Sequence, residues 1–442
     1  MKWNGNTAVI GGGLAGIAAA DAAIRRGASV TLFEGTGVLG GRLASLFDTQ
    51  IQKYLDIGQH LFFGCCTNLI AVNQSLGLDR FFKAYHSLPF AAADGKRWMM
   101  KPVRCLPKHL QFLPAVLQMP FIPFPQRLTT ARLLNTFVNA KNLTGTVADF
   151  LTLHSVSPEA VTHVWEPMIF SVLSETLECS SAAAAQSVIR NVFLGSATIF
   201  VPSVPLRTIY NSSASAALQS KGVSLRLYSR VNRLRWEKTD GGQRITALEL
   251  ADGTEETFDR YILAVPFSYL WKILQESDLE DFNAALALDR FELGTITTAH
   301  LFLDRPLVPD ALPMTMLTGG CGQFLCRPQL APNAFGYHHT VVISASHRLL
   351  TETEISVSGK ELLVSRITGQ LRQTFGVPDL AVRYSRIVTN FEAVFSPNPL
   401  VFNNRPASAT PFSNLTLAGD WTQTGYPSTM EGAAQSGIAA LR

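Results

Sequence analysis

The chain has 442 residues, of which 47% are hydrophobic and 16% are charged, against roughly 25% charged residues in an ordinary soluble domain. This length allows two or more domains with full cores, and the composition indicates an apolar surface or an interior that receives an apolar ligand. The net charge of +4 is too small to indicate a nucleic-acid partner, and the six cysteines lack the spacing of a metal site or a thioredoxin-like site.

Cysteines without such spacing in a chain of this length indicate reduced thiols in the cytoplasm. The apolar run over residues 1–23 is compatible with a signal peptide, but its glycine spacing and the charges that follow fit a strand, a turn and a helix better. No stretch of 18 residues is both apolar and free of helix breakers, so we expect no membrane-spanning helix.

The first fifty residues predict a nucleotide-binding unit. A short apolar strand at 7–10 leads into glycines, an alanine-rich helix follows at 14–26, and a second strand at 29–33 stops at Glu34. In such units an acidic side chain at the end of the second strand binds a ribose hydroxyl. Strand, glycines, helix, strand and acid therefore occur in the order that a dinucleotide site requires.

The glycines of this unit have the G-x-G-x-x-G spacing. Gly11 permits a tight turn, Gly13 lets a pyrophosphate approach the main chain, and Gly16 packs the helix on the strand. The free amide groups at the start of the helix, at Leu14 and Ala15, then face the phosphates together with the positive end of the helix dipole.

The stretch GVLGGRL at 37–43 distinguishes between dinucleotides, because Glu34 suits NAD and FAD equally. Its glycine pair ends at Gly41 and is followed by Arg42, which brings another cation towards the same phosphates. The stretch resembles the G-G-R signature of the FAD-dependent amine oxidase and phytoene desaturase superfamily. The resemblance implies FAD as the cofactor.

The middle of the chain contains a basic segment that is interrupted by prolines. Between Asp94 and Asp149 there is no acidic residue, and residues 110–126 are uncharged and contain four prolines, which exclude a straight membrane-spanning helix. Apolar residues flanked by cations suit the headgroup region of an anionic leaflet. We therefore expect residues 95–148 to attach the protein peripherally to the inner leaflet of a membrane. The alternative is a buried lid whose basic residues face water. The basic residues are Lys96, Arg97, Lys101, Arg104, Lys108, Arg127, Arg132 and Lys141.

The C-terminal residues resemble the returning segment of the same superfamily. An apolar strand ends at Gly419 and Asp420, and a helix of small residues begins near residue 429. The resemblance implies that Asp420 binds the ribityl or pyrophosphate region and that the main chain at Met430 faces the pyrimidine edge of the flavin. The start of this helix can stabilise negative charge on the reduced flavin.

Strands expected at 223–236, 245–250 and 258–266 complete the nucleotide unit, and the resemblance places the backbone of Val231 beside the adenine. The fold class implied is α/β: a Rossmann-like FAD-binding domain of the glutathione-reductase-2 type, interrupted by an α+β substrate domain with a mixed sheet and helices. We expect the first domain to comprise 1–85, 205–270 and 412–442. The insertions at 86–204 and 271–411 are expected to form the second.

Three further stretches resemble hydroxysqualene dehydroxylase, the squalene-associated FAD-dependent enzyme family of bacterial hopanoid synthesis. They are DIGQHLFFGCCTNL at 56–69, WEPMIFSVLSET at 165–176 and TGYPSTMEGAAQSG at 424–437. Cys66 departs from the family pattern, which has an aromatic there, and so does the pair at 174–175.

The resemblance implies that hydroxysqualene, reduced FAD and a proton give squalene, water and oxidised FAD. Protonation of the allylic hydroxyl and loss of water leave a delocalised cation that a hydride from the flavin can quench. Two residues are candidate proton donors. His60 follows Gly58 in a stretch that the resemblance brings near the flavin, and burial of Glu166 would keep its carboxyl protonated. Alternatively, His60 braces a loop and Glu166 caps a helix or pairs with an arginine.

Three other readings stay open. A carotene or phytoene desaturase would oxidise a hydrocarbon with the same FAD and the same apolar tunnel. An amine oxidase would need an aromatic cage, and a flavin-bearing membrane scaffold would need no turnover at all. We find no second nucleotide motif, so the flavin is reduced either by NAD(P)H or by an external reductase.

Overall fold

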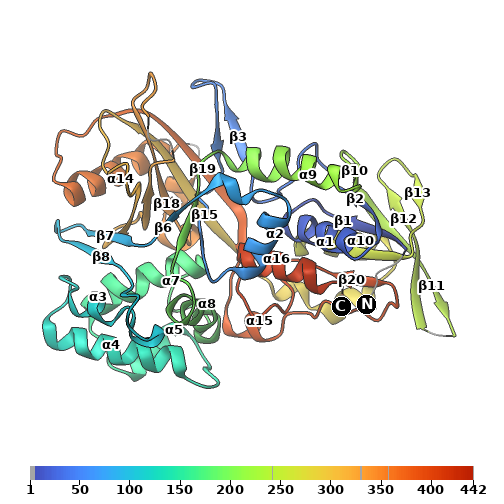
Figure 1. Cartoon of the computed structure of the whole chain (residues 1–442), viewed down its shortest axis with the longest axis horizontal. Coiled ribbons are helices and arrows are strands. Elements are labelled where there is room, and N and C mark those ends of the chain that lie inside the picture. Colours follow the sequence, from blue (N-terminus) through green and yellow to red (C-terminus); the bar gives the residue numbers. More distant parts are fainter. Residues whose placement is uncertain (1–4, 241, 329–330, 357, 442) are drawn as a thin grey trace.

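The structure is a computed structural model that describes residues 5–240, 242–328, 331–356 and 358–441. A five-stranded sheet, entirely parallel in its pairings, has the order β10-β2-β1-β14-β20. It joins strands from the beginning, middle and end of the chain (Figure 1). The strands are β1 (Asn6–Ile10), β2 (Ser29–Phe33), β10 (Ser224–Arg226), β14 (Arg260–Leu263) and β20 (Leu415–Leu417).

Helix α1 (Leu14–Arg25) is alanine-rich, and ten of its residues are buried. Small side chains let it approach both the sheet and α16 (Met430–Ala439), whose N-cap Thr429 accepts a hydrogen bond from the Gly432 N–H. A Cβ on Gly437 would lie 2.2 Å from the carbonyl oxygen of Ala15, so α1 and α16 meet backbone to backbone. The two ends of the chain therefore share one core.

The strands predicted for this unit agree with the structure except at one place. The single strand expected over 223–236 is wrong, because Tyr228 has a positive φ of 54° and turns the chain. The segment forms β10 and then β11 (Val231–Thr239), which belongs to a three-stranded antiparallel sheet. That sheet also contains β12 (Gly242–Leu250) and β13 (Glu255–Glu256).

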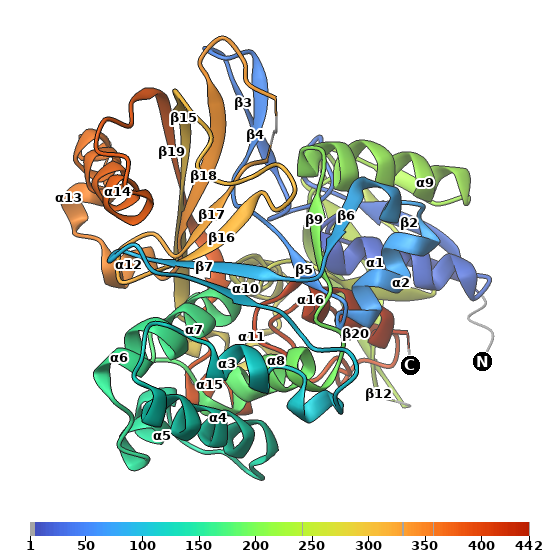
Figure 2. The same cartoon turned by 60° about the vertical axis from the view of Figure 1, so that its left-hand side comes forward.

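A seven-stranded mixed sheet forms the second region, with the order β19-β15-β18-β17-β16-β7-β8 (Figure 2). Strands from both insertions meet in it, since β7 pairs in parallel with β16. The strands are β7 (Leu88–Ala92), β8 (Arg97–Met100), β15 (Leu293–Leu303), β16 (Met314–Thr318), β17 (Phe324–Cys326), β18 (Tyr337–Ile343) and β19 (Val382–Phe395). The boundaries between the two domains stay a prediction.

Helices of the first insertion pack below this sheet around the buried Trp165 and Phe137 (Figure 2). They are α3 (Leu113–Leu117), α4 (Phe124–Asn139), α5 (Val147–Leu153), α6 (Pro158–Ala160), α7 (Glu166–Leu173) and α8 (Ala182–Leu194). Six apolar residues of 110–126 are buried, four of them in this core, which agrees with the alternative of a lid for that part of the segment. The buried ones are Phe112, Ala115, Val116, Met119, Phe121 and Ile122.

The remaining elements connect the two regions or cover them. The hairpin of β3 (Ser45–Asp48) and β4 (Lys53–Asp56) extends from the nucleotide unit, and β5 (Phe62–Phe63), β6 (Phe82–Tyr85) and β9 (Ile199–Pro202) form a small sheet. Among the residues that the structure describes, no helix is long and apolar enough to cross a bilayer. The other helices are α2 (Thr67–Ser75), α9 (Ala214–Ser220), α10 (Phe267–Glu276), α11 (Glu280–Leu286), α12 (Ser346–Leu349), α13 (Glu352–Ile355), α14 (Lys360–Phe375) and α15 (Pro399–Asn403).

Candidate active site

One large cavity of about 910 Å³ extends from the glycine turn after β1 to the strands of the mixed sheet. Its size is near the upper end of the range of ~300–1,000 Å³ for ligand pockets. We call it the flavin chamber. The predicted site residues that line it are Gly11, Gly13, Leu14, Ala15, Glu34, Gly41, Arg42, Gly58, His60, Val231, Gly419, Asp420 and Met430.

Two predicted residues do not line the chamber. Gly16 lies behind its wall, where a Cβ would be 1.8 Å from the carbonyl oxygen of Gly11. This contact is the close packing of helix on strand that the motif assigns to its last glycine. Glu166 begins α7, and burial together with the nearby Glu178 raises the pKa of its carboxyl.

The glycine turn has room for a phosphate group. A Cβ on Gly13 would meet no atom within 4 Å, and one on Gly41 would lie 3.2 Å from the Cα of Gly13. The first free N–H groups of α1 follow directly, without a side-chain cap. Open space between two stretches of glycine backbone at a helix N-terminus fits the pyrophosphate of a dinucleotide.

Glu34 is held in place at the end of β2. Its Oε2 accepts a hydrogen bond from the Gly12 N–H at 2.8 Å, and its Oε1 accepts one from the Thr36 N–H at 2.7 Å. The Thr36 hydroxyl also donates to Oε1 at 2.8 Å. These bonds orient the carboxylate at the chamber wall, and Oε2 keeps a further lone pair for a ribose hydroxyl.

Arg42 and Asp420 join the two ends of the chain across the chamber. The Arg42 guanidinium donates to Asp420 and to the carbonyl oxygen of Ala393 at 3.0 Å, and the Ser428 hydroxyl also donates to Asp420. Burial alone would raise the pKa of Asp420, but Arg42 and Ser428 hold it below its usual value. The carboxylate is therefore charged at neutral pH.

Glu431 is a lining residue to which the sequence reasoning assigned no role. It follows Met430 and is buried, and its carboxylate accepts hydrogen bonds from the backbone N–H groups of Asn68 and Leu69. It thus caps the N-terminus of α2, where a negative charge is stabilised by the helix dipole. The residue is part of the quoted C-terminal stretch, but its partners lie more than 350 residues away in the chain.

His60 is half-buried at the chamber wall. One ring nitrogen, Nδ1, lies 2.9 Å from the carbonyl oxygen of Gly58, so it carries the proton in the neutral ring and Nε2 is an acceptor. Burial lowers the pKa of His60, and the Arg42 charge lowers it further against the opposing effect of Gly58. The neutral ring predominates at neutral pH.

The sequence profile of the flavin-containing amine oxidoreductases matches residues 14–440. The chain belongs to this family. It is an FAD-dependent oxidoreductase with the amine oxidase fold.

Individual relatives of this amine oxidoreductase cover nearly its whole length. A hydroxysqualene dehydroxylase from Zymomonas mobilis is 26% identical over 98% of this chain and 97% of its own. A probable zeta-carotene desaturase from Synechococcus elongatus is 24% identical over 98% of this chain and 97% of its own. The crystal structure of an oxidoreductase from Methanosarcina mazei has a TM-score of 0.73 at 16% identity, covering 98% of this chain and 99% of that one.

The far end of the flavin chamber in this oxidoreductase is apolar. Side chains from α7, α8, β9, the mixed sheet and the residue before β5 line it. These residues are Leu61, Leu88, Val172, Val188, Ile199, Met316, Phe324 and Val342. The sequence pattern alone does not distinguish such residues from those of a core.

Several polar lining residues were also missed by the sequence reasoning. Arg230 follows β10, Lys272 lies on α10 and Glu392 lies on β19. No motif contains them, because they come from three distant segments that line the chamber only after folding.

Proposed function

We propose that this oxidoreductase reductively removes the hydroxyl group of hydroxysqualene to give squalene, as one step of hopanoid or related triterpenoid synthesis. The observation that carries the proposal is the apolar end of the flavin chamber, which adjoins the FAD motifs and offers surface for a long isoprenoid chain. The resemblance over nearly the full length to a dehydroxylase supports the same substrate.

Different residues would bind the cofactor and transfer the proton. Gly13, Glu34, Arg42 and Asp420 would hold FAD, and bound FAD would supply the hydride. The apolar side chains would orient the substrate and exclude water, so that the allylic cation is not captured by solvent. A protonated hydroxyl then leaves as water.

Of the two candidate donors, His60 is the one that lines the chamber, and we propose that it protonates the leaving hydroxyl. Because its pKa is lowered, the charged ring is a strong acid once it forms. The free lone pair on Nε2 is the place where that proton would be held.

The second candidate function is a carotene desaturase, because a carotene desaturase covers this chain as fully as the dehydroxylase does. The two reactions need opposite redox states of the flavin. An anaerobic single turnover distinguishes them. Holoenzyme with reduced flavin, mixed with hydroxysqualene, is expected to become oxidised while squalene forms. Oxidised holoenzyme that is reduced by a polyene precursor, with no reaction of hydroxysqualene, would establish the desaturase instead.

We also propose that the enzyme takes its substrate at a membrane surface through a basic apolar patch on β8, on the segment that leads from β8 to α3, and on α4. β8, α3 and α4 lie together at one corner of the molecule (Figure 1), and α3 packs on both of the others. Large apolar side chains are exposed there at Met99, Leu110, Phe124 and Leu128. Exposed cations beside them are Lys101, Arg104, Lys108 and Arg132.

Flotation with liposomes that contain anionic lipid tests this attachment. Reversal of the charges at Lys101, Arg104 and Lys108 is expected to leave the protein at the bottom of the gradient, because each cation near an anionic surface contributes about 1 kcal/mol. Equal flotation of the wild type and the variant would remove the membrane from the proposal. That result would not count against the proposed dehydroxylase reaction.

A further inference from the structure

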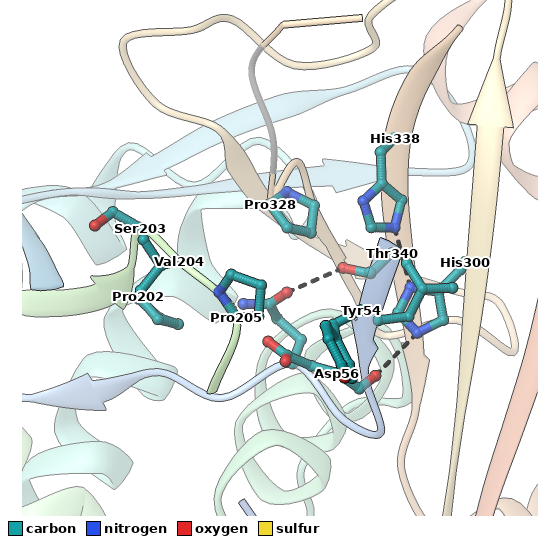
Figure 3. A pocket seen from close by; sticks show the side chains of 12 residues that line it. Tyr54, Asp56, Pro202, Ser203, Val204, Pro205, His300, Pro328, His338 and Thr340 are labelled. Carbon is teal, nitrogen blue, oxygen red and sulfur yellow. Dashed lines mark hydrogen bonds between the residues drawn. The ribbon is translucent and has the colours of Figure 1, made fainter. Parts of the chain in front are cut away.

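A second, smaller cavity lies behind the loop that carries His60. It encloses about 130 Å³, room for several waters at ~30 Å³ each, and polar groups from β4, β15 and β18 face it (Figure 3). We call it the Asp56 cavity. Its lining residues are Tyr54, Leu55, Asp56, Gln59, Pro202, Ser203, Val204, Pro205, His300, Pro328, His338 and Thr340.

The Asp56 cavity spans from the surface to the flavin chamber. Tyr54 is 39% exposed at one side, and Ser203 is exposed as well. At the other side Gln59 borders both cavities, and its Oε1 accepts a hydrogen bond from the Thr340 hydroxyl at 3.3 Å. One side chain thus separates the polar cavity from the chamber.

The hydrogen bonds of Asp56 leave one carboxyl oxygen for the cavity. The Ser45 hydroxyl donates at 2.6 Å and the Leu206 N–H donates at 2.9 Å, and both bonds end on Oδ1. The other carboxyl oxygen, Oδ2, accepts neither of these hydrogen bonds and is left for the cavity. This oxygen is the natural contact for a water molecule.

Two histidines continue the polar wall in a defined order. His300 Nε2 lies 2.9 Å from the carbonyl oxygen of Asp56 and must donate to it, so His300 Nδ1 accepts from His338 Nε2 at 3.0 Å. His338 Nδ1 is then a buried acceptor, and it finds no partner among the described residues. A buried acceptor without a partner indicates a bound water.

We propose that the Asp56 cavity is the proton entrance of the flavin chamber, with water linking the surface to Gln59 and with the Asp56 carboxyl holding the proton for each turnover. The proposal rests on the proposed function, in which each turnover consumes one proton. That proton enters from solvent, is held on Asp56, passes through water to the donor in the chamber and leaves in the product water. The Asp56 carboxylate then takes up the next proton from solvent.

The electrostatics of the cavity suit such a group. Burial raises the pKa of Asp56 to about 6 against the opposing effect of its two hydrogen bonds, while burial keeps His300 and His338 neutral by lowering their pKa values. Asp56 is thus the group in this cavity that changes charge near neutral pH. Other titratable or charged groups around the cavity are Lys53, Tyr54, Arg207, Asp48, Arg386 and His339.

The test compares three variants of the holoenzyme. Asp56→Asn keeps the shape and removes the titrating proton. Ser45→Ala removes a hydrogen bond that stabilises the carboxylate, so it is expected to raise the pKa of Asp56. Asp48→Asn is the matched control on the paired strand of the same hairpin, because hydrogen bonds hold the pKa of Asp48 below its usual value despite burial.

The first readout is the infrared band of a protonated carboxyl, which needs no substrate. In the wild type one component of this band is expected to disappear with a midpoint near pH 6. That component is expected to be missing from the difference spectrum of Asp56→Asn and to shift to higher pH in Ser45→Ala. A wild type without such a band would overturn the assignment of the proton to Asp56.

The second readout is the pH profile of single-turnover flavin oxidation by hydroxysqualene. The wild-type rate is expected to fall as pH rises through about 6. Asp56→Asn is expected to react about tenfold more slowly, or slower still, on the acid side of this transition and to lose the dependence on pH there. Asp48→Asn should keep the wild-type profile. Equal rates and profiles in the wild type and Asp56→Asn would overturn the proton entrance. A wild type that is not oxidised at all would instead overturn the proposed function.

Discussion

At the scale of single residues, Gly13 and Gly16 belong to one motif but serve different partners. Gly13 faces the open space of the flavin chamber, whereas Gly16 touches the backbone of Gly11 inside the protein. Neither has a positive φ, so the constraint at each position is space rather than backbone conformation. A methyl group added at Gly13 should therefore affect cofactor binding, whereas one added at Gly16 should affect folding.

We expect Gly13→Ala to fold with an unchanged thermal midpoint in the apo form and to bind FAD at least about tenfold more weakly, or about 1.4 kcal/mol. Its methyl group would occupy the space of the pyrophosphate. Gly16→Ala is expected to unfold at a lower temperature even without FAD, because a Cβ 1.8 Å from a carbonyl oxygen must displace backbone. Calorimetry and FAD titration of both variants check this. Tight FAD binding by Gly13→Ala would contradict the placement of the phosphates.

The second prediction at this scale concerns Arg42. The folded-state pKa of Asp420 lies below its usual value, so the pair contributes stability above that usual pKa and loses it as pH falls through the folded pKa. In Arg42→Gln, burial would act on Asp420 without its counter-charge. We expect a loss of about 2 kcal/mol at neutral pH, less than for a fully buried pair because the Arg42 side chain is 40% exposed.

Urea unfolding of the apo protein at neutral pH and at about pH 5 measures this loss. It should shrink at the lower pH, where the Asp420 carboxyl of the variant becomes protonated. Asp420→Asn in the same background should recover much of the stability. A loss that does not depend on pH would mean that Arg42 acts through packing alone.

At the scale of elements, α4 contacts both the protein core and the solvent. Its buried side, which includes Leu133 and Phe137, belongs to the core around Trp165, while Phe124 at its first turn is 58% exposed. The pattern of apolar residues with prolines predicted an apolar segment but did not determine whether it contacts a membrane or the protein core. The packing divides the segment between the core and the surface.

We expect Phe124→Ser with Leu128→Ser to reduce partitioning onto anionic liposomes by tenfold or more, since each exposed apolar side chain contributes roughly 1.5–3 kcal/mol on full burial. Stability should be unchanged, because both side chains are exposed already. Leu362→Ser on α14 is the matched control, as Leu362 is exposed to a similar degree at another part of the molecule. If the control lowers partitioning as much as the double variant does, this patch is not the docking surface.

At the scale of the whole molecule, the chamber exists only because the two ends of the chain pack together. α1 meets α16 through small residues, and β20 adds the edge strand that leads to Gly419 and Asp420. Stability and FAD binding are therefore coupled: a ligand that binds only the folded form stabilises it by about 2.7 kcal/mol at a hundredfold excess over Kd.

Gly437→Ala tests this coupling, because its methyl group would separate α16 from α1. We expect a loss of about 1–3 kcal/mol in the free energy of unfolding together with weaker FAD binding. Gly369→Ala is the matched control in α14, where a Cβ meets no atom within 4 Å and helix propensity favours alanine. Both changes are read from thermal unfolding with and without FAD. Normal FAD binding by an unstable Gly437→Ala would contradict the coupling.

The nucleotide unit could be predicted from the sequence because its signals are local. The glycine spacing, Glu34 and the G-G-R stretch each act within a few residues of backbone, where spacing alone determines geometry. The turn at Tyr228 escaped prediction because a tyrosine with positive φ has no signal in the sequence. A hydrogen bond from its backbone N–H to the carbonyl oxygen of Thr36, a distant residue in the chain, holds it there.

The sequence by itself determined the FAD-binding motifs and the prolines that exclude a straight membrane-spanning helix. Only the tertiary structure decided which apolar residues line the flavin chamber rather than the core, that His60 lies at its wall, and that Asp56 faces a cavity of its own. The physical reason is the range of the interactions. Turns, caps and helix dipoles depend on neighbours in sequence, whereas cavities and shifted pKa values depend on distant segments that meet only after folding.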